Sequence, residues 1–171
     1  MFFGRNLFTS ALLALAASAA VSGLELLTAH LTCASGIDGT VSFTVIADYH
    51  TEVSLNFKGL HKGEKYNYFV NQYPVPAGGD CTKTGVMYDP FLAFMDKANY
   101  KCKKNKPLPC AMGDLTGRAG KPLKGKGREG VSDIDAFDVV SDQGKYQFKG
   151  RSVVLFDGQG QLVACANIVA A

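Results

Sequence analysis

The chain has 171 residues and a formal net charge of +3. Once an N-terminal secretory signal is set aside, roughly 150 residues remain, which is enough for one domain that buries about two-thirds of its unfolded surface. No second long apolar run follows the signal, so we expect no membrane span.

The expected signal covers residues 1–22, MFFGRNLFTSALLALAASAAVS. It combines one Arg, an apolar run of about a dozen residues and small residues of the A-x-A type, a pattern typical of a cleaved secretory signal. We expect cleavage between Ala19 and Gly23, and a single domain over 23–171 that is secreted.

Alternating apolar residues predict half-buried strands. TVSFTV places Val41, Phe43 and Val45 on one face, and EVSLNF does the same with Val53, Leu55 and Phe57. Similar β-branched and aromatic segments follow, separated by Gly-rich turns: YNYFV, DAFDVV, KYQFK, RSVVLF and LVACANI. Seven or eight short strands of this kind favour an all-β Greek-key barrel or sandwich.

Two connections are long for a compact domain, about 75–115 and 117–130, and such loops usually carry function or descend from loops that did. The segment PFLAFMDKANYKC is the one place where the sequence suggests a single helical turn.

The five cysteines lie at 33, 81, 102, 110 and 165. Secretion places them in an oxidising compartment, where pairing is expected, and an odd number leaves one over. Cys102 and Cys110 are too far apart for the usual zinc knuckle, so disulfides are favoured over a metal site.

Seven segments resemble, in order, landmarks of the copper/zinc superoxide dismutase family, and especially of its secreted fungal copper-only branch. They are GTVSF, FKGL, YPVPAGGDC, TGVMYDP, CAMGDLTGRAG, RSVVLF and VACANI. The resemblance implies an eight-stranded Greek-key β-barrel or sandwich of superoxide dismutase type with long loops, in agreement with the strand pattern. It also implies disulfides Cys81–Cys165 and Cys102–Cys110, which would leave Cys33 over.

The copper ligands of that family are a His-x-His pair on a strand, a third histidine in the next loop and a fourth at the end of the RSVV strand. Matched motif by motif, these positions are Phe69, Asn71, Met87 and Phe156. Phe offers no lone pair, Asn only a weak carbonyl oxygen and Met one soft thioether, whereas copper cycling needs three or four strong ligands. We therefore expect neither copper nor zinc, and no dismutation by the family's route.

Other positions that serve the metal region of the family have also changed. The arginine that steers superoxide corresponds to Leu162, and the histidine expected after GDLTG corresponds to Ala119. Asp114 is retained, and the simplest interpretation is a turn residue that bonds its own backbone.

Further motifs give little evidence of a functional site. His30, His50 and His61 have no ligand spacing and are interpreted as scattered surface residues. The aspartates of SDIDAFD, at 133, 135 and 138, lack the EF-hand glycine and terminal Glu. GKGREG, with glycines at 125, 127 and 130, has neither the preceding strand nor the following helix of a nucleotide loop.

Charge is concentrated between Lys97 and Arg128, where ten of the 18 Lys and Arg residues lie. They are Lys97, Lys101, Lys103, Lys104, Lys106, Arg118, Lys121, Lys124, Lys126 and Arg128. Such a field attracts polyanions, with Lys121, Lys124, Lys126 and Arg128 as candidate contacts for an acidic glycan or a protein; a solvated loop surface is the alternative. Nucleic acid is not favoured, since only Tyr100 is interleaved among the charges of a secreted chain.

Three hypotheses follow. The first is a catalytically inactive member of the fold, reused as a binding or structural module, such as a fungal effector or a cell-surface protein. The second is a superoxide dismutase with an unconventional site or with a metal supplied by a partner chain. The third is a weak copper or polyanion binder that acts through its basic loops.

Overall fold

The computed structural model describes most of the expected domain, and the expected signal lies outside the described residues. Described are residues 26–33, 36–47, 50–104, 110–125, 128–131, 136–137 and 147–171, with the backbone alone at 46–47, 128–131 and 136–137. No helix in these ranges is long and apolar enough to cross a membrane.

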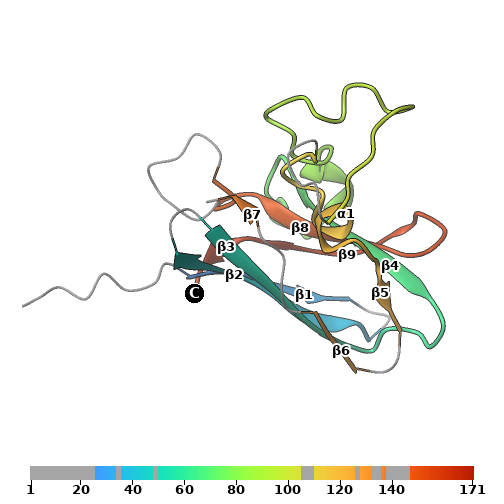
Figure 1. Ribbon diagram of the computed structural model, residues 1–171. Helices are drawn as coiled ribbons and strands as arrows, with labels where there is room; N and C mark the ends of the chain where they lie inside the picture. Colours follow the sequence, from blue (N-terminus) through green and yellow to red (C-terminus); the bar gives the residue numbers. More distant parts are fainter. Residues whose placement is uncertain are drawn as a thin grey trace, which may run out of the picture.

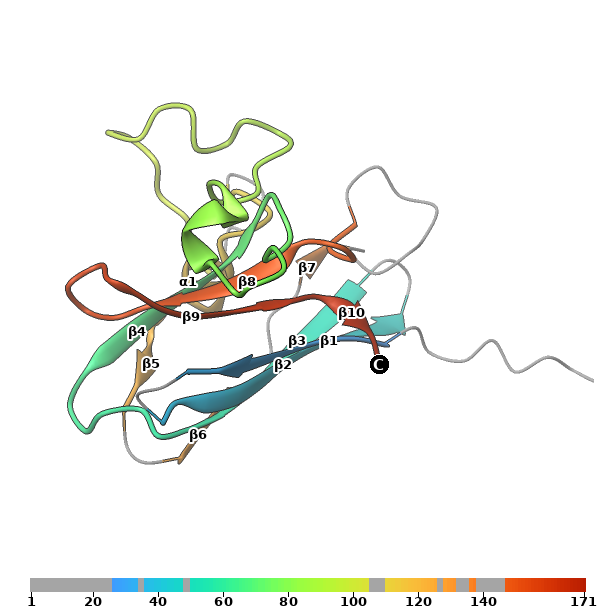
Figure 2. The ribbon, with the colours of Figure 1, turned by 180° about the vertical axis from the view of Figure 1, so that it is seen from behind.

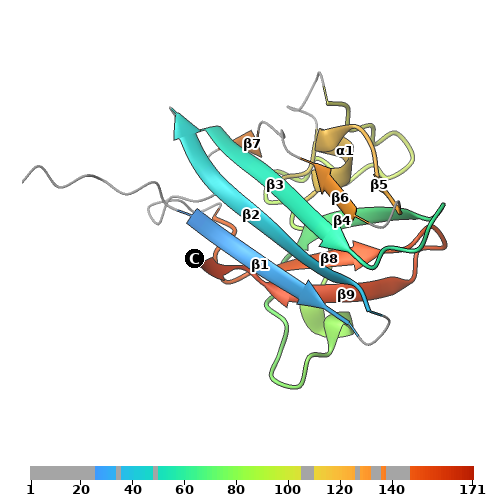
Figure 3. The ribbon, with the colours of Figure 1, turned by 90° about the horizontal axis from the view of Figure 1, so that it is seen from below.

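The described chain forms two antiparallel sheets, seen as two layers in Figures 1 and 3. The first sheet runs β10-β1-β2-β3-β6, and β7 also pairs with β3. Its strands are β1 (Leu26–Thr32), β2 (Asp38–Ala47), β3 (His50–Lys58), β6 (Arg128–Val131), β7 (Ala136–Phe137) and β10 (Val169–Ala170). The second sheet runs β5-β4-β8-β9 and contains β4 (Lys65–Asn71), β5 (Leu123–Lys124), β8 (Ser152–Phe156) and β9 (Leu162–Asn167).

The strand count agrees with the predicted fold class. β6 and β7 both pair with β3 and act as two segments of one edge strand. With these merged and the two-residue β10 set aside, each sheet has four strands. The chain crosses from the first sheet to the second after β3, returns for β6, and crosses again before β8. The expected eight-stranded Greek-key architecture is confirmed.

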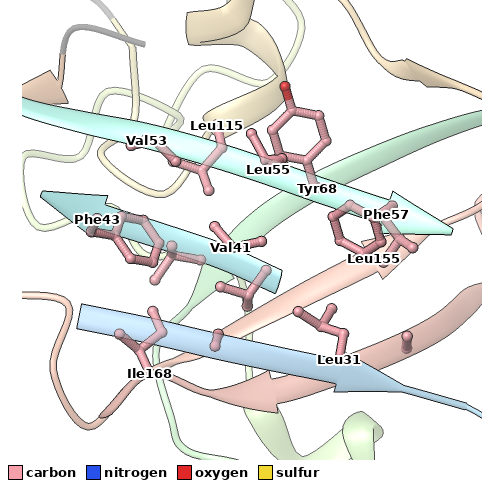
Figure 4. Packing of buried hydrophobic residues seen from close by; sticks show 14 of the residues in the cluster. Leu31, Val41, Phe43, Val53, Leu55, Phe57, Tyr68, Leu115, Leu155 and Ile168 are labelled. Atoms are coloured by element: carbon pink, nitrogen blue, oxygen red, sulfur yellow. The ribbon is translucent and has the colours of Figure 1, made fainter. Parts of the chain in front are cut away.

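Side chains that alternate along the strands build the core between the sheets (Figure 4). On β3, Val53 and Phe57 are fully buried, and on β2, Val41 and Phe43 are fully buried, as the sequence predicts. β4 sends Tyr66, Tyr68 and Val70 into the core. Because successive side chains point to opposite faces, Asn67, Phe69 and Asn71 lie on its outer face.

Several elements differ from the sequence prediction. In KYQFK, the described residues Gln147–Lys149 form no strand, although Phe148 is fully buried and packs edge-on against Phe43 with ring centroids 5.4 Å apart. The segment 90–99 forms successive turns instead of a helix. In the described ranges, helical structure is confined to the 3-10 helix η1 (Cys81–Thr84) and the short helix α1 (Leu115–Ala119). The alternating strand β1 was also missed.

The connection between β4 and β5 covers the outer face of the second sheet. It carries η1 and α1, and in Figures 1 and 2 the green-to-yellow loop lies over β4 and β8. Cys81 joins η1 to Cys165 on β9, and Cys102 is bonded to Cys110 within the loop. The long loops therefore cover the face of β4 that carries Phe69 and Asn71.

Candidate functional site

The four positions matched to copper ligands come together in one place. Phe69 and Asn71 lie two residues apart on β4; Met87 forms an isolated bridge with Asn71, and Phe156 ends β8 opposite Asn67. All four line a single cavity of about 520 Å³. The rest of its lining comes from Asn67, Gly85, Phe94, Tyr100, Asp114, Thr116 and Gly117.

Aromatic rings dominate the cavity. Phe69 and Phe156 meet edge to face with centroids 5.9 Å apart, and the loop residues Phe94 and Tyr100 form a second such pair at 4.7 Å. Lys97 Nζ lies 5.6 Å from the centroid of the Phe94 ring. The sequence motifs predict the first pair, but Phe94 and Tyr100 lie in a segment without periodicity and were missed.

Backbone hydrogen bonds attach the loop to β4. Val70 N–H donates to Gly113 O over 2.9 Å, Tyr88 N–H donates to Val70 O over 2.8 Å, and Gly113 N–H donates to Tyr88 O over 2.7 Å. A Cβ on Gly113 would lie 2.3 Å from Val70 O, so this close approach of three chain segments requires glycine. The glycine of GDL thereby fixes Met87 and Asp114 beside β4.

Asp114 caps α1, which confirms its interpretation as a residue that bonds its own backbone: Oδ1 accepts from Gly117 N–H over 2.8 Å. Its other oxygen, Oδ2, accepts from the Tyr100 hydroxyl over 2.7 Å. That hydroxyl also accepts from Ala111 N–H. Burial, and then the hydrogen bond to Asp114, raise the pKa of Tyr100 above its usual value, so its neutral form is favoured.

Asn71 is buried, and both hydrogens of its amide are used. Its Nδ2 donates to Thr84 Oγ1 over 2.9 Å and to Gly85 O over 3.0 Å. No described residue donates a hydrogen bond to its Oδ1. Asn71 is thus a lining residue of the cavity whose amide is held in place by its two N–H groups and whose carbonyl oxygen remains an unused acceptor within the described part of the chain.

The residues at the four positions do not fit copper. They supply two phenyl rings, one amide whose N–H groups are engaged elsewhere, and one thioether. Among the described residues, no group of three or more His, Cys, Asp or Glu side chains could hold a metal ion. Copper and zinc sites in proteins are built mainly from imidazole, thiolate or carboxylate ligands, and one thioether does not complete such a site. Ala119, at the position of an expected histidine, is buried on α1.

Both disulfides implied by the resemblance are present, and neither involves Cys33. Cys33 packs against the core. Leu162, matched to the steering arginine, is half-buried at the start of β9.

The basic residues do not all share one environment. The exposed lysines between residues 97 and 125 are Lys97, Lys101, Lys103, Lys104, Lys121 and, on β5, Lys124. The expected basic surface also included Arg118, and this expectation is wrong because Arg118 is buried. Its guanidinium donates hydrogen bonds to the carbonyls of Ala111 and Cys110. Lys106, Lys126 and the Arg128 side chain lie outside the described part.

The remaining motifs do not gather into a site. His30 bonds Asp38, and His61 lies 3.6 Å from Glu64, each on its own turn or strand. Gly125 exchanges backbone hydrogen bonds with Gly63 and Glu64, so it serves a turn contact. Gly127 and the three aspartates of SDIDAFD lie outside the described residues.

No family model matches the chain. It is 30% identical over 138 residues to a curated relative named cell-surface copper–zinc superoxide dismutase 4 of Candida albicans, covering 80% of this chain and 56% of the relative. It is 29% identical to the cell-surface copper-only superoxide dismutase 5 of the same organism, covering 57% of that relative. The chain thus spans little more than half the length of these relatives.

The solved structure of Candida albicans superoxide dismutase 5 with Cu(II) superimposes with a TM-score of 0.69 at 26% identity, covering 86% of this chain and 93% of that one. The disulfides and the cell-surface relatives agree with the expected location outside the cell. In sequence and in fold the chain is therefore similar to the superoxide dismutases of the Candida cell surface.

Proposed function

We propose that this chain is a superoxide dismutase-like pseudoenzyme, which lacks a copper site and serves as a binding or structural module at the cell surface or as a secreted effector. One observation carries the proposal: the four positions matched to copper ligands line one cavity, and none of them is a histidine.

The physical argument concerns both oxidation states of copper. Dismutation requires a site that holds Cu(I) and Cu(II) in turn, which in proteins takes three or four strong ligands. Phe69 and Phe156 supply none, and their rings lie in contact where ligands would converge. Asn71 and Met87 leave at most one amide oxygen and one thioether, which is too few for a closed site.

The test is metal analysis and superoxide removal by the purified chain 23–171 after incubation with Cu(II). We expect no stoichiometric copper and no superoxide removal above a protein blank. The matched control restores Phe69, Asn71, Met87 and Phe156 to His together. Copper bound only by this variant would support the proposal, whereas one tightly held copper per parent chain with turnover would establish the alternative, an enzyme with an unconventional site.

A second candidate function, polyanion binding, is favoured by the exposed lysines of the long loops. Lys124 lies on β5 and Lys121 lies just before it. Lys101, Lys103 and Lys104 lie in the connection that precedes α1. Exposed like charges close in sequence create a field that attracts acidic glycans. This candidate uses a different surface from the cavity and is compatible with the loss of copper.

A further inference from the structure

We propose that the cavity binds a small, neutral, planar aromatic molecule that carries a hydrogen-bond donor on its ring edge, of the indole or phenol class. The inference rests on the proposed function, because it requires that copper does not occupy the site. The cavity of about 520 Å³ lies within the range of about 300–1,000 Å³ that is typical of small-molecule sites.

The walls favour an aromatic guest. Four rings from two parts of the chain line the cavity: Phe69 and Phe156 from the sheet, Phe94 and Tyr100 from the loop. Both pairs are edge to face, which leaves ring faces and edges for a further ring to contact in the same geometry. The Met87 thioether adds a polarisable contact of the kind that sulfur makes with rings.

The polar part of the lining selects for a donor. Asn71 Oδ1 is an acceptor that no described residue uses, and its orientation is fixed because both amide hydrogens bond Thr84 and Gly85. A ligand N–H or O–H that meets this oxygen satisfies it, whereas a ligand acceptor would leave it unpaired.

The one charged residue of the lining disfavours anionic ligands. The Asp114 carboxylate lines the cavity and would repel an anion, while its own charge is already stabilised by hydrogen bonds from Tyr100 and Gly117. A neutral ligand avoids this repulsion and does not have to give up the hydration of a charge on entering an aromatic site.

The loop that supplies Phe94 also exposes apolar side chains. Phe91 is 58% exposed, Leu92 62% and Met95 73%, and none of them lines the cavity. Phe91 therefore offers a matched control for Phe94: the same residue type in the same loop, outside the cavity.

Indole is the probe for the test, because the chain has no Trp and the fluorescence of indole is read without a Trp background. We expect one indole bound per chain 23–171. Blocking the donor with 1-methylindole should weaken binding roughly tenfold, the loss expected for one hydrogen bond. Indole-3-acetate, an anion, should bind more weakly than indole, because the Asp114 carboxylate lines the cavity.

Variants locate the site. Phe94→Ala should weaken indole binding roughly tenfold or more, since aromatic truncation removes a wall of the cavity, whereas Phe91→Ala should leave it unchanged. Circular dichroism verifies that both variants fold. Equal effects of the two substitutions, or no indole binding by the parent at millimolar concentration, would overturn the inference.

Copper analysis of the same samples separates the two proposals. A parent that is free of copper and does not bind indole contradicts only this inference, whereas a parent loaded with copper contradicts the proposed function as well. The variant with four restored histidines should gain copper and lose indole, because both would occupy the same volume. Binding of indole and copper together by that variant would also overturn the inference.

Discussion

At the scale of single residues, the hydrogen bond from Tyr100 to Asp114 gives a pH-dependent prediction. The folded-state pKa of Tyr100 is raised, first by burial and then by this bond, so the associated stability is fully present below the unfolded pKa of about 10 and is lost as pH rises above it. Tyr100→Phe should cost about 1 kcal/mol at neutral pH and should reduce the loss of stability in alkali.

Thermal unfolding of parent and Tyr100→Phe between neutral and alkaline pH measures this effect. The variant should still lose some stability in alkali, because burial and the charge of Asp114 also raise the pKa of Tyr68. Identical slopes of stability against pH for the two proteins would contradict the assignment.

The residues of the candidate site differ in how far the sequence could predict them. Phe69, Asn71, Met87 and Phe156 could be placed because ordered motifs fix their positions along the chain, and the structure brings them to one cavity. Phe94 and Tyr100 could not, because their loop is held by turns and by a bond to a distant carboxylate, and neither leaves a periodic pattern.

At the scale of elements, Gly113 joins the loop to β4 and gives a stability prediction. Gly113→Ala places a Cβ 2.3 Å from Val70 O and 2.9 Å from Tyr88 N, both backbone atoms that cannot move independently. We expect a loss of at least about 2 kcal/mol in the free energy of unfolding. Gly158→Ala is the control, since its Cβ would meet only Lys65 O at 3.6 Å, an ordinary contact. Urea unfolding compares the two, and similar midpoints would refute the role given to Gly113.

The disulfides give a second prediction at this scale. Cys81–Cys165 spans a separation of 84 residues and Cys102–Cys110 only 8. In the chain-entropy model, the long loop contributes about 4 kcal/mol and the short one about 2 to 3 kcal/mol. The double variant Cys81→Ala/Cys165→Ala should therefore lose more stability in denaturant than Cys102→Ala/Cys110→Ala. Peptide mapping without reduction checks the pairing, which a link to Cys33 within one chain would contradict.

The strands could be predicted where one face is buried and alternation is complete, as on β2 and β3. β1 alternates equally well, with Leu27, Ala29 and Leu31 fully buried, but in the sequence it closely follows the apolar run that was interpreted as a signal, and this run obscures the pattern. At Phe148 a strand was predicted that does not form. The aromatic residues of KYQFK resemble a strand, yet Phe148 lies at a turn and is still fully buried, because burial alone does not require backbone pairing.

At the scale of the whole molecule, the fold separates its core from its site. On β4 the core depends on Tyr66, Tyr68 and Val70, while Phe69 and Asn71 lie on the opposite face under the long loops. Residues on that outer face can change from histidine to phenylalanine without altering the packing between the sheets. A retained fold is therefore compatible with a changed function, which must be argued from the site.

The last prediction concerns the long-range field of the basic loops. Replacing Lys121, Lys124, Lys126 and Arg128 by Ser should leave folding intact, because Lys121 and Lys124 are exposed and exposed charges contribute little to stability. It should lower the salt concentration at which the protein elutes from an anionic glycan matrix, since each neutralised anionic group releases a counterion on binding. The control replaces Lys58, Lys62, Lys83 and Lys149, which are exposed. Both variants lose four positive charges. Retention that falls equally in the two variants would show that net charge governs binding and would refute a specific basic surface.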